Sequence, residues 1–187
     1  MFRRLSGLPP YGPRATTVPP GWGHGAREGA VVEFRGSDGS VWVGNFEPGF
    51  TGLDDVVAHP NGVDVLVVAG GRLFQVKPDS HDTVCVASAV TEMWPLADPP
   101  RLLFNNQGLA FFCIGWNGLV WATPRISWDG FRNLRLDGEV LEGEAWSPDG
   151  DRWSPFSVSV ADGAVVGGTY SGPDMQFHYD QLERGPA

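Results

Sequence analysis

The sequence has a single lysine, two cysteines and no long apolar run. No apolar stretch approaches the roughly 20 residues that a membrane-spanning helix needs. The arginines near the start are followed by proline and glycine, and no apolar segment typical of a signal peptide follows them. We therefore expect a cytoplasmic protein without a membrane partner. We attribute the scarcity of lysine, present only as Lys77, to codon bias in a G+C-rich genome.

Positive charge is also scarce, because the chain has 13 basic and 22 acidic residues, which gives a net charge of −9. Proteins that bind nucleic acid without sequence preference need a basic stripe to displace counterions. Anionic membrane surfaces likewise attract basic segments. The charge balance argues against both partners and is compatible with a basic partner protein or a cationic ligand. It gives no oligomeric state.

The common catalytic and metal-binding motifs are missing. The four histidines are scattered without metal-ligand spacing, so we expect no metal and no cofactor. No G-x-S-x-G, P-loop or dinucleotide-binding glycine motif occurs. Cys85 and Cys113 lie in apolar, strand-like stretches, which predicts two buried thiols rather than a disulfide. A nucleophile–base pair of Cys85 with His59 or His81 is the less favoured alternative, because buried strand thiols are usually inert.

No segment shows apolar residues at sustained helical spacing. The sequence instead contains short apolar stretches, read as strands, that are separated by glycine-containing turns. The pattern is clearest from Leu134 to Tyr170, where turns are predicted at Asp137-Gly138, at Ser147 to Gly150 and at Asp162-Gly163. Eleven to thirteen such strands are expected at a spacing of about 8–12 residues. Residues 51–58 are read as one helical turn or a short strand, and residues 90–100 as a proline-containing connector. The predicted fold is all-β, an antiparallel meander of short strands that forms a sandwich or an open barrel.

Three regions follow from composition. Residues 1–29 are rich in proline and glycine and predict an extended arm, which Leu8, Tyr11, Val18 and Trp22 could pin to the body. Residues 30–172 predict a single β domain. Residues 173–187 form a polar C-terminal tail that we expect to fray.

Two resemblances concern the whole chain. Repeated hairpins such as G-S-D-G-S-V-W-V-G-N and W-N-G-L-V-W-A-T resemble the inner hairpin of propeller blades. Ordinary blades take about 40–50 residues each and at least four are needed, so we judge the chain too short for a propeller. The chain also resembles a widespread group of uncharacterised bacterial β-rich proteins without an assigned activity. The matching stretches are G-L-P-P-Y-G-P (7–13), W-V-G-N-F (42–46), H-P-N-G (59–62), residues 65–71, S-W-D-G (127–130) and G-E-A-W-S-P (143–148). This resemblance implies a bacterial, cytoplasmic protein and no catalytic residue.

The candidate site lies in the acidic second half. Glu142 and Glu144 are two residues apart on a predicted strand, which places both carboxylates on one face, about 7 Å apart. Such a pair could act on a glycoside or bind a cation, but the favoured interpretation is a solvated strand face kept charged against aggregation. The tryptophans at 116, 121, 128, 146 and 153 are read first as core residues, and otherwise as a binding surface. The candidate binding residues are Trp128, Asp129, Glu142, Glu144, Trp146, Asp149, Asp151 and Trp153.

Two functions are compatible with these features. The first is a non-enzymatic protein-binding module, such as an inhibitor or immunity-type protein for a basic toxin or nuclease. The second is a carbohydrate- or small-ligand-acting enzyme or lectin-like module that uses Glu142, Glu144 and nearby tryptophans. The sequence shows no group of catalytic residues, which favours the first function, and we therefore assign no catalytic residue.

Overall fold

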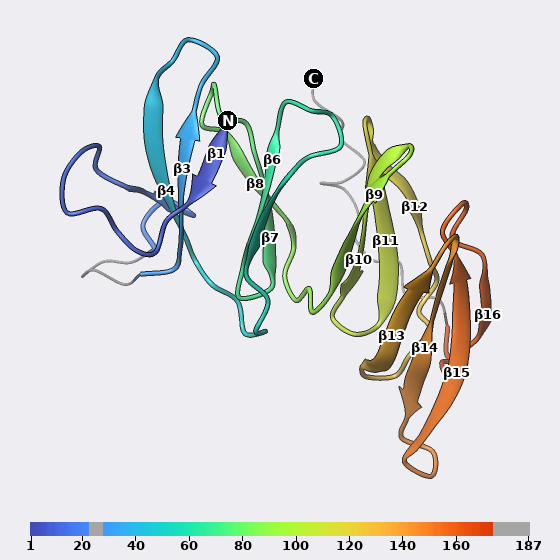
Figure 1. Cartoon of the computed structure of the whole chain (residues 1–187). Coiled ribbons are helices and arrows are strands. Elements are labelled where there is room, and N and C mark those ends of the chain that lie inside the picture. The colour runs from blue at the N-terminus through green and yellow to red at the C-terminus, as the bar shows by residue number, and fades with distance from the viewer. Residues whose placement is uncertain (23–27, 174–187) are drawn as a thin grey trace. The chain divides into compact units, whose positions relative to one another are not determined.

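The computed structural model describes residues 1–22 and 28–173, and within these ranges it contains sixteen strands and no helix (Figure 1). None of the described segments is a helix that could cross a bilayer. The strands form four four-stranded sheets, and all but one of the strand pairings are antiparallel. The expected all-β fold of short antiparallel strands is confirmed.

The chain divides into two compact units, Met1–Ala89 and Val90–Ala187, each with two of the four sheets. The single β domain over residues 30–172 stays a prediction. Most of the predicted C-terminal tail, with Met175, Phe177 and Tyr179, lies outside the described residues.

The first unit contains the first and second sheets. The first sheet has the order β1-β3-β4-β2, with β1 Phe2–Arg4, β2 Thr16–Val18, β3 Ala30–Arg35 and β4 Val41–Phe46. The second sheet runs in sequence order through β5 Asp55–Ala58, β6 Val65–Ala69, β7 Arg72–Val76 and β8 Thr83–Ala87. The two sheets share a core that includes Phe34 and Phe46 from the first sheet and Val67, Phe74 and Val76 from the second.

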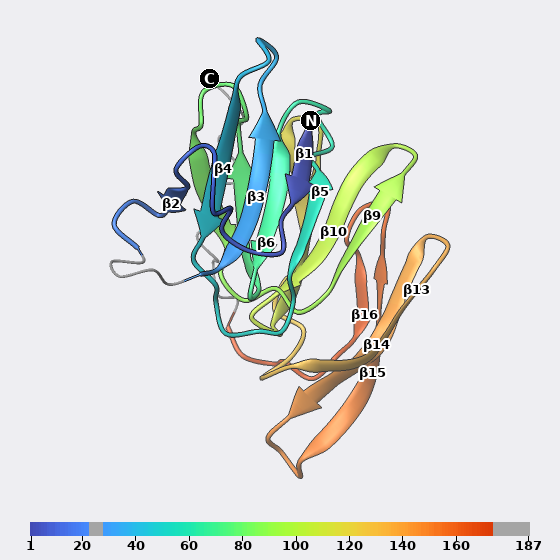
Figure 2. The ribbon, with the colours of Figure 1, turned by 60° about the vertical axis from the view of Figure 1, so that its left-hand side comes forward.

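The proline-rich segment supplies both edges of the first sheet. Phe2 to Arg4 pairs antiparallel with β3, and Thr16 to Val18 pairs parallel with β4 (Figure 2). Edge strands tolerate neighbouring prolines because only one side of their backbone must be hydrogen-bonded. Of the residues expected to pin this segment, Val18 is buried in the core, whereas Tyr11 is 90% exposed.

The second unit contains two sheets that both run in sequence order. The third sheet comprises β9 Met93–Ala97, β10 Pro100–Asn106, β11 Ala110–Gly115 and β12 Gly118–Ala122. The fourth comprises β13 Phe131–Asp137, β14 Val140–Ser147, β15 Arg152–Ser159 and β16 Val165–Gly167. Their shared core includes Leu103, Phe111 and Trp121 from the third sheet and Leu141, Phe156 and Val158 from the fourth.

Each meander of the last three sheets takes 30 to 37 residues, fewer than the roughly 40–50 of an ordinary propeller blade, and the expectation that the chain is too short for a propeller of ordinary blades stays a prediction. Two sequence-based expectations about the elements need correction. The connector at 90–100 contains strand β9, and Pro95 fits there because β9 is an edge strand. The turn of the β13–β14 hairpin is Gly138-Glu139, one residue later than predicted, with Gly138 at φ +58°.

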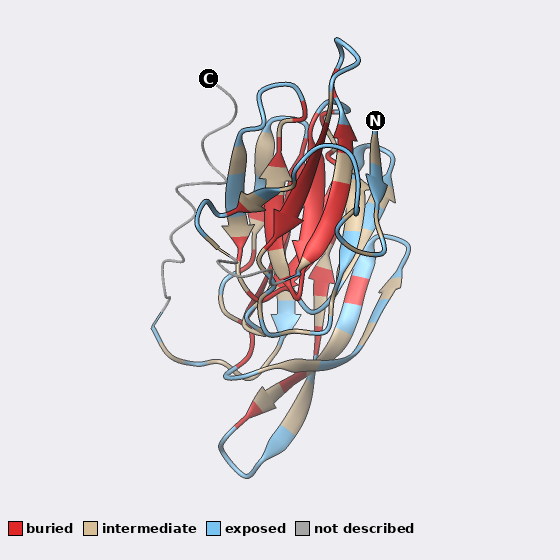
Figure 3. Cartoon of the chain, turned by 90° about the vertical axis from the view of Figure 1, so that its left-hand side faces the viewer, coloured by how far each residue is buried: buried red, intermediate tan, exposed pale blue. Residues whose placement is uncertain are grey.

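Of the two cysteines, only Cys85 differs from expectation. Both are free, and Cys113 is fully buried in β11. Cys85 is exposed, because β8 is the edge strand of the second sheet. Of the two structures expected within residues 51–58, the short strand forms, as β5 Asp55–Ala58. Figure 3 shows that buried residues concentrate in the strands, while the turns that join them are exposed.

Candidate functional site

The fourth sheet, formed by β13 to β16 (Figure 1), has one face in the core and one outer face, and the candidate residues lie mainly on the outer face. Leu141 and Ala145 of β14 belong to the buried core. Because side chains alternate along a strand, Glu142, Glu144 and Trp146 point the other way. Trp153 of β15 is the direct cross-strand partner of Trp146, so it shares the same face.

A bulge in β13 brings two further residues to Glu144. Arg132 is paired with Glu144 and Arg135 with Glu142, so three steps along β13 match two along β14. Asn133 in the bulge has φ +55°, a region that asparagine adopts more readily than most residues. Arg132 Nε donates to Glu144 Oε2 at 2.9 Å, and Asn133 Nδ2 donates to the same oxygen at 2.7 Å.

These contacts fix the charge of Glu144. The hydrogen bonds from Arg132, and then that from Asn133, lower the pKa of the Glu144 carboxyl below its ordinary value. A general acid for glycoside hydrolysis needs the opposite shift, so that it keeps its proton near neutral pH. Glu144 in this arrangement is a fixed anion that is already paired with Arg132.

The two tryptophans at the centre of the face are held by charged neighbours. The Arg132 guanidinium carbon lies 4.5 Å from the centroid of the Trp153 ring. Trp146 Nε1 donates to Asp151 Oδ1 at 2.8 Å. Both tryptophans are partly exposed, so their remaining surface is available for contact while their orientation is restrained.

Trp128 belongs to a neighbouring cluster. Its backbone N–H donates to the Trp146 carbonyl at 3.2 Å, which places the 127–130 turn beside one end of β14. Arg125 lies over the rings of both Trp128 and Tyr170, with its guanidinium carbon 5.6 Å and 4.4 Å from their centroids. Trp128 is 36% exposed, and the adjacent Asp129 is exposed as well.

The face and its turns carry an excess of negative charge. Residues 129–152 contain seven carboxylates and three arginines, which leaves four negative charges. Each arginine has a carboxylate partner: Glu144 for Arg132, Asp137 for Arg135 and Asp149 for Arg152. Within the described ranges, Asp129, Glu139, Glu142 and Asp151 form no ion pair, so their charge is open to a partner.

The sequence therefore identified most of this face, but it missed residues that organise it. Glu142, Glu144, Trp146 and Trp153 share the face, and Asp149 and Asp151 lie in the turn that joins their strands. Arg132 and Asn133 were missed, because a bulge without glycine gives no clear sequence signal. The core interpretation of the five tryptophans was wrong for four of them, because only Trp121 is buried.

Comparisons with known proteins add little to this geometry. No protein-family profile matches the chain, and no curated protein matches it. Among solved structures, a provisionally assigned 6-phosphogluconolactonase from Bacteroides fragilis is similar over 74% of this chain, with a TM-score of 0.44 and 16% identity. The matched region covers 50% of that protein, so this chain corresponds to about half of its length.

Proposed function

We propose that this chain is a non-enzymatic module that binds a basic partner protein through the outer face of its fourth sheet. The observation that carries the proposal is the cross-strand pair Trp146 and Trp153, held partly exposed among carboxylates. In its sharpest form, the chain is a bacterial, cytoplasmic inhibitor or immunity-type protein that blocks a basic toxin or nuclease.

The composition of the face supports this function. Tryptophan, tyrosine and arginine dominate binding hot spots, because they combine large contact areas with polar groups. Trp146 of β14 and Trp153 of β15 lie directly opposite each other, and the Trp128 cluster lies beside one end of β14. The surrounding excess of four negative charges would speed encounter with a basic surface and disfavour acidic partners.

The carbohydrate alternative has less support from the same contacts. A sugar stacks on an open indole face, whereas Arg132 lies over the Trp153 ring. The lowered pKa of Glu144 also suits a permanent anion better than a proton donor. In a lectin-like role, the sugar would have to contact the exposed part of the Trp146 indole and Glu142.

The test is affinity capture from a lysate of the native host on immobilised chain, at low and at moderate salt. Three baits are compared: the unchanged chain, Glu142→Lys on the face, and Asp98→Lys as a control with the same charge change outside the fourth sheet. We expect the unchanged and Asp98→Lys baits to capture a protein with a basic isoelectric point. Moderate salt should weaken this capture, and the Glu142→Lys bait should not capture the protein. Capture of no protein, of an acidic protein, or of the same protein equally by all three baits would overturn the proposal.

A further inference from the structure

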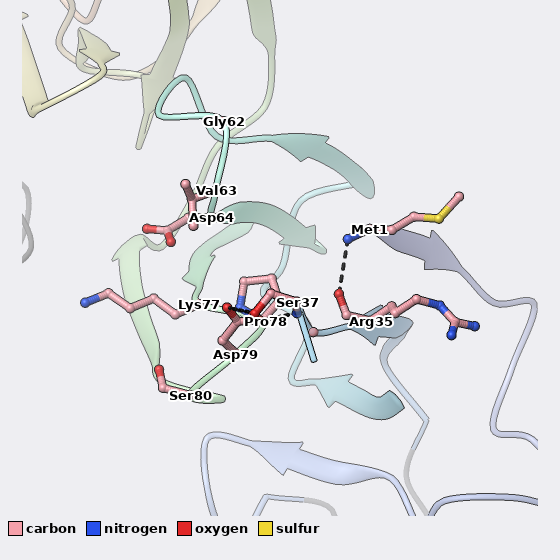
Figure 4. Close-up of a pocket in the computed structure, with 11 residues that line it drawn as sticks. Met1, Arg35, Ser37, Gly62, Val63, Asp64, Lys77, Pro78, Asp79 and Ser80 are labelled. Carbon is pink, nitrogen blue, oxygen red and sulfur yellow. Dashed lines mark hydrogen bonds between the residues drawn. The ribbon is translucent and has the colours of Figure 1, made fainter. Parts of the chain in front are cut away.

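The first unit contains a hollow of about 370 Å³ at one end of its two sheets (Figure 4). Three connections line it: the β3–β4 turn, the turn before β6 and the β7–β8 turn. The Met1 ammonium and Arg35 also line it, and its other polar side chains are Ser37, Asp64, Lys77, Asp79 and Ser80. Val63 and Pro78 add apolar surface. The volume is within the range of sites for small molecules, about 300–1,000 Å³.

The walls of the hollow are fixed before any ligand arrives. Asp79 accepts hydrogen bonds from the Ser37 backbone N–H at 2.7 Å and from the Ser37 hydroxyl at 2.8 Å. These bonds connect the β3–β4 and β7–β8 turns and lower the pKa of the Asp79 carboxyl. The buried Trp42 indole N–H donates to the Pro78 carbonyl at 2.9 Å, which fixes the β7–β8 turn. A site fixed in this way loses little entropy on binding.

Asp64 is the unusual group in this lining. Its residue is only 5% exposed, and its Oδ2 accepts a hydrogen bond of 2.6 Å from the neutral Gln75 amide. Within the described parts of the chain it forms no ion pair. The nearby His59 supplies no counter-charge near neutral pH, because burial lowers the pKa of that histidine. A nearly buried carboxylate without a cation is costly, so an ammonium group from a ligand would be stabilised here.

Lys77 provides the opposite charge. It is the only lysine of the chain, and among the described residues it has no carboxylate partner. In Figure 4 the Lys77 amine and the Asp64 carboxylate extend to the same side, away from Met1 and the Arg35 guanidinium. The two charges are not joined in an ion pair, so each can pair with a ligand group of opposite sign.

From this arrangement we propose that the hollow binds a small zwitterion of the α-amino acid type. The ligand ammonium faces Asp64, with Asp79 nearby, and the ligand carboxylate faces Lys77. A ligand with only negative charge would meet two carboxylates, and a ligand with only positive charge would meet Lys77. The site lies in the first unit and is independent of the proposed protein-binding face.

The test is isothermal titration calorimetry of the full chain with the twenty common L-amino acids. Each amino acid that binds is compared with the amine that lacks its carboxylate and the acid that lacks its ammonium; for alanine these are ethylamine and propanoate. We expect saturable binding of at least one amino acid, and affinities lower by about tenfold or more for both truncated compounds, because each loses a charge-assisted contact.

Variants assign the binding to this hollow. Lys77→Met and Asp64→Asn should each lower the affinity for the amino acid by about tenfold or more. Lys77→Arg should retain binding. Arg14→Met is the control for loss of an exposed cation in the same unit. Circular dichroism checks the folding of Asp64→Asn, and Lys77→Met decides the result should that variant unfold. No binding of any amino acid at millimolar concentration, equal binding of a truncated compound, or unchanged binding by Lys77→Met would overturn the proposal.

Discussion

Asn133 donates a hydrogen bond of 2.7 Å to Glu144 from a backbone position at φ +55°. The two residues belong to adjacent strands, and the bulge in β13 brings the asparagine side chain to the same face as the carboxylate. This single irregularity places Arg132 and Asn133 on the carboxylate of Glu144. Its energetic role can be separated into backbone and side-chain parts.

Replacing Asn133 by alanine should destabilise the protein by about 1 kcal/mol more than replacing it by glycine. Both variants lose the hydrogen bond to Glu144, but only alanine keeps a β-carbon that disfavours positive φ. Urea unfolding of the two variants measures the difference. Equal stability would show that the bulge relaxes to another backbone conformation.

Replacing Phe111 by alanine should lower the free energy of unfolding by about 3–5 kcal/mol. The Phe111 side chain is fully buried, and its ring centroid lies 4.7 Å from that of Phe131 and 5.6 Å from that of Phe156. The matched control is Val166→Ala, because Val166 is 71% exposed and should change stability by less than about 0.5 kcal/mol. Chemical denaturation measures both variants.

Stability should fall as the pH is lowered through the range in which His59 titrates. Burial lowers the pKa of His59 in the folded state, an effect that Asp64 and the hydrogen bond with Asn61 only partly oppose. The unfolded chain therefore binds the proton first, below a pH of about 6.5. The stabilisation by neutral His59 is complete above that pH and is lost as the pH falls through the folded pKa, at up to about 1.4 kcal/mol per pH unit.

The His59→Asn variant provides the measurement for this effect. Urea unfolding at a series of pH values between 7 and 5 should show a shallower loss of stability in the variant than in the unchanged chain. Parallel curves would mean that other groups cause the pH dependence.

The two thiols should differ in reactivity in the native state. Cys113 is fully buried, whereas Cys85 is an exposed residue of edge strand β8 whose Sγ is partly covered next to the Ala87 carbonyl. Full burial of Cys113 and partial burial of the Cys85 sulfur raise the pKa of both thiols. We expect a neutral-pH thiol reagent to modify Cys85 slowly and Cys113 only after unfolding. Mass spectrometry locates the label, and Cys85→Ser should abolish native labelling. Native labelling of Cys113 would contradict the burial of β11.

Much of the second unit follows from local sequence signals. Turns form close to the predicted positions Ser147 to Gly150 and Asp162-Gly163, at residues 148–151 and 160–162. Proline, aspartate and glycine favour turn geometry through their own backbone preferences. Apolar and polar residues alternate over positions 156–160, and Phe156 and Val158 lie in the core accordingly. Glu142 and Glu144 share a face for the same reason.

The short strands at 2–4 and 16–18 were missed, because their backbone pairs with strands β3 and β4, which lie many residues away. The same limit applies to the tryptophans. Their sequence neighbours do not reveal that Trp121 lies in a core while its neighbour Trp116 is 66% exposed.

The sequence by itself determined an acidic chain of short antiparallel strands with carboxylates and tryptophans close together in its second half. These properties depend on residue type, on period-two alternation and on turn chemistry, which all act over a few residues. Only the tertiary structure decided that Arg132 and Asn133 hold Glu144, and that Asp64 and Lys77 line one hollow. These arrangements bring together residues that are 11 to 13 positions apart in the sequence, and they depend on strand register, the bulge and sheet packing.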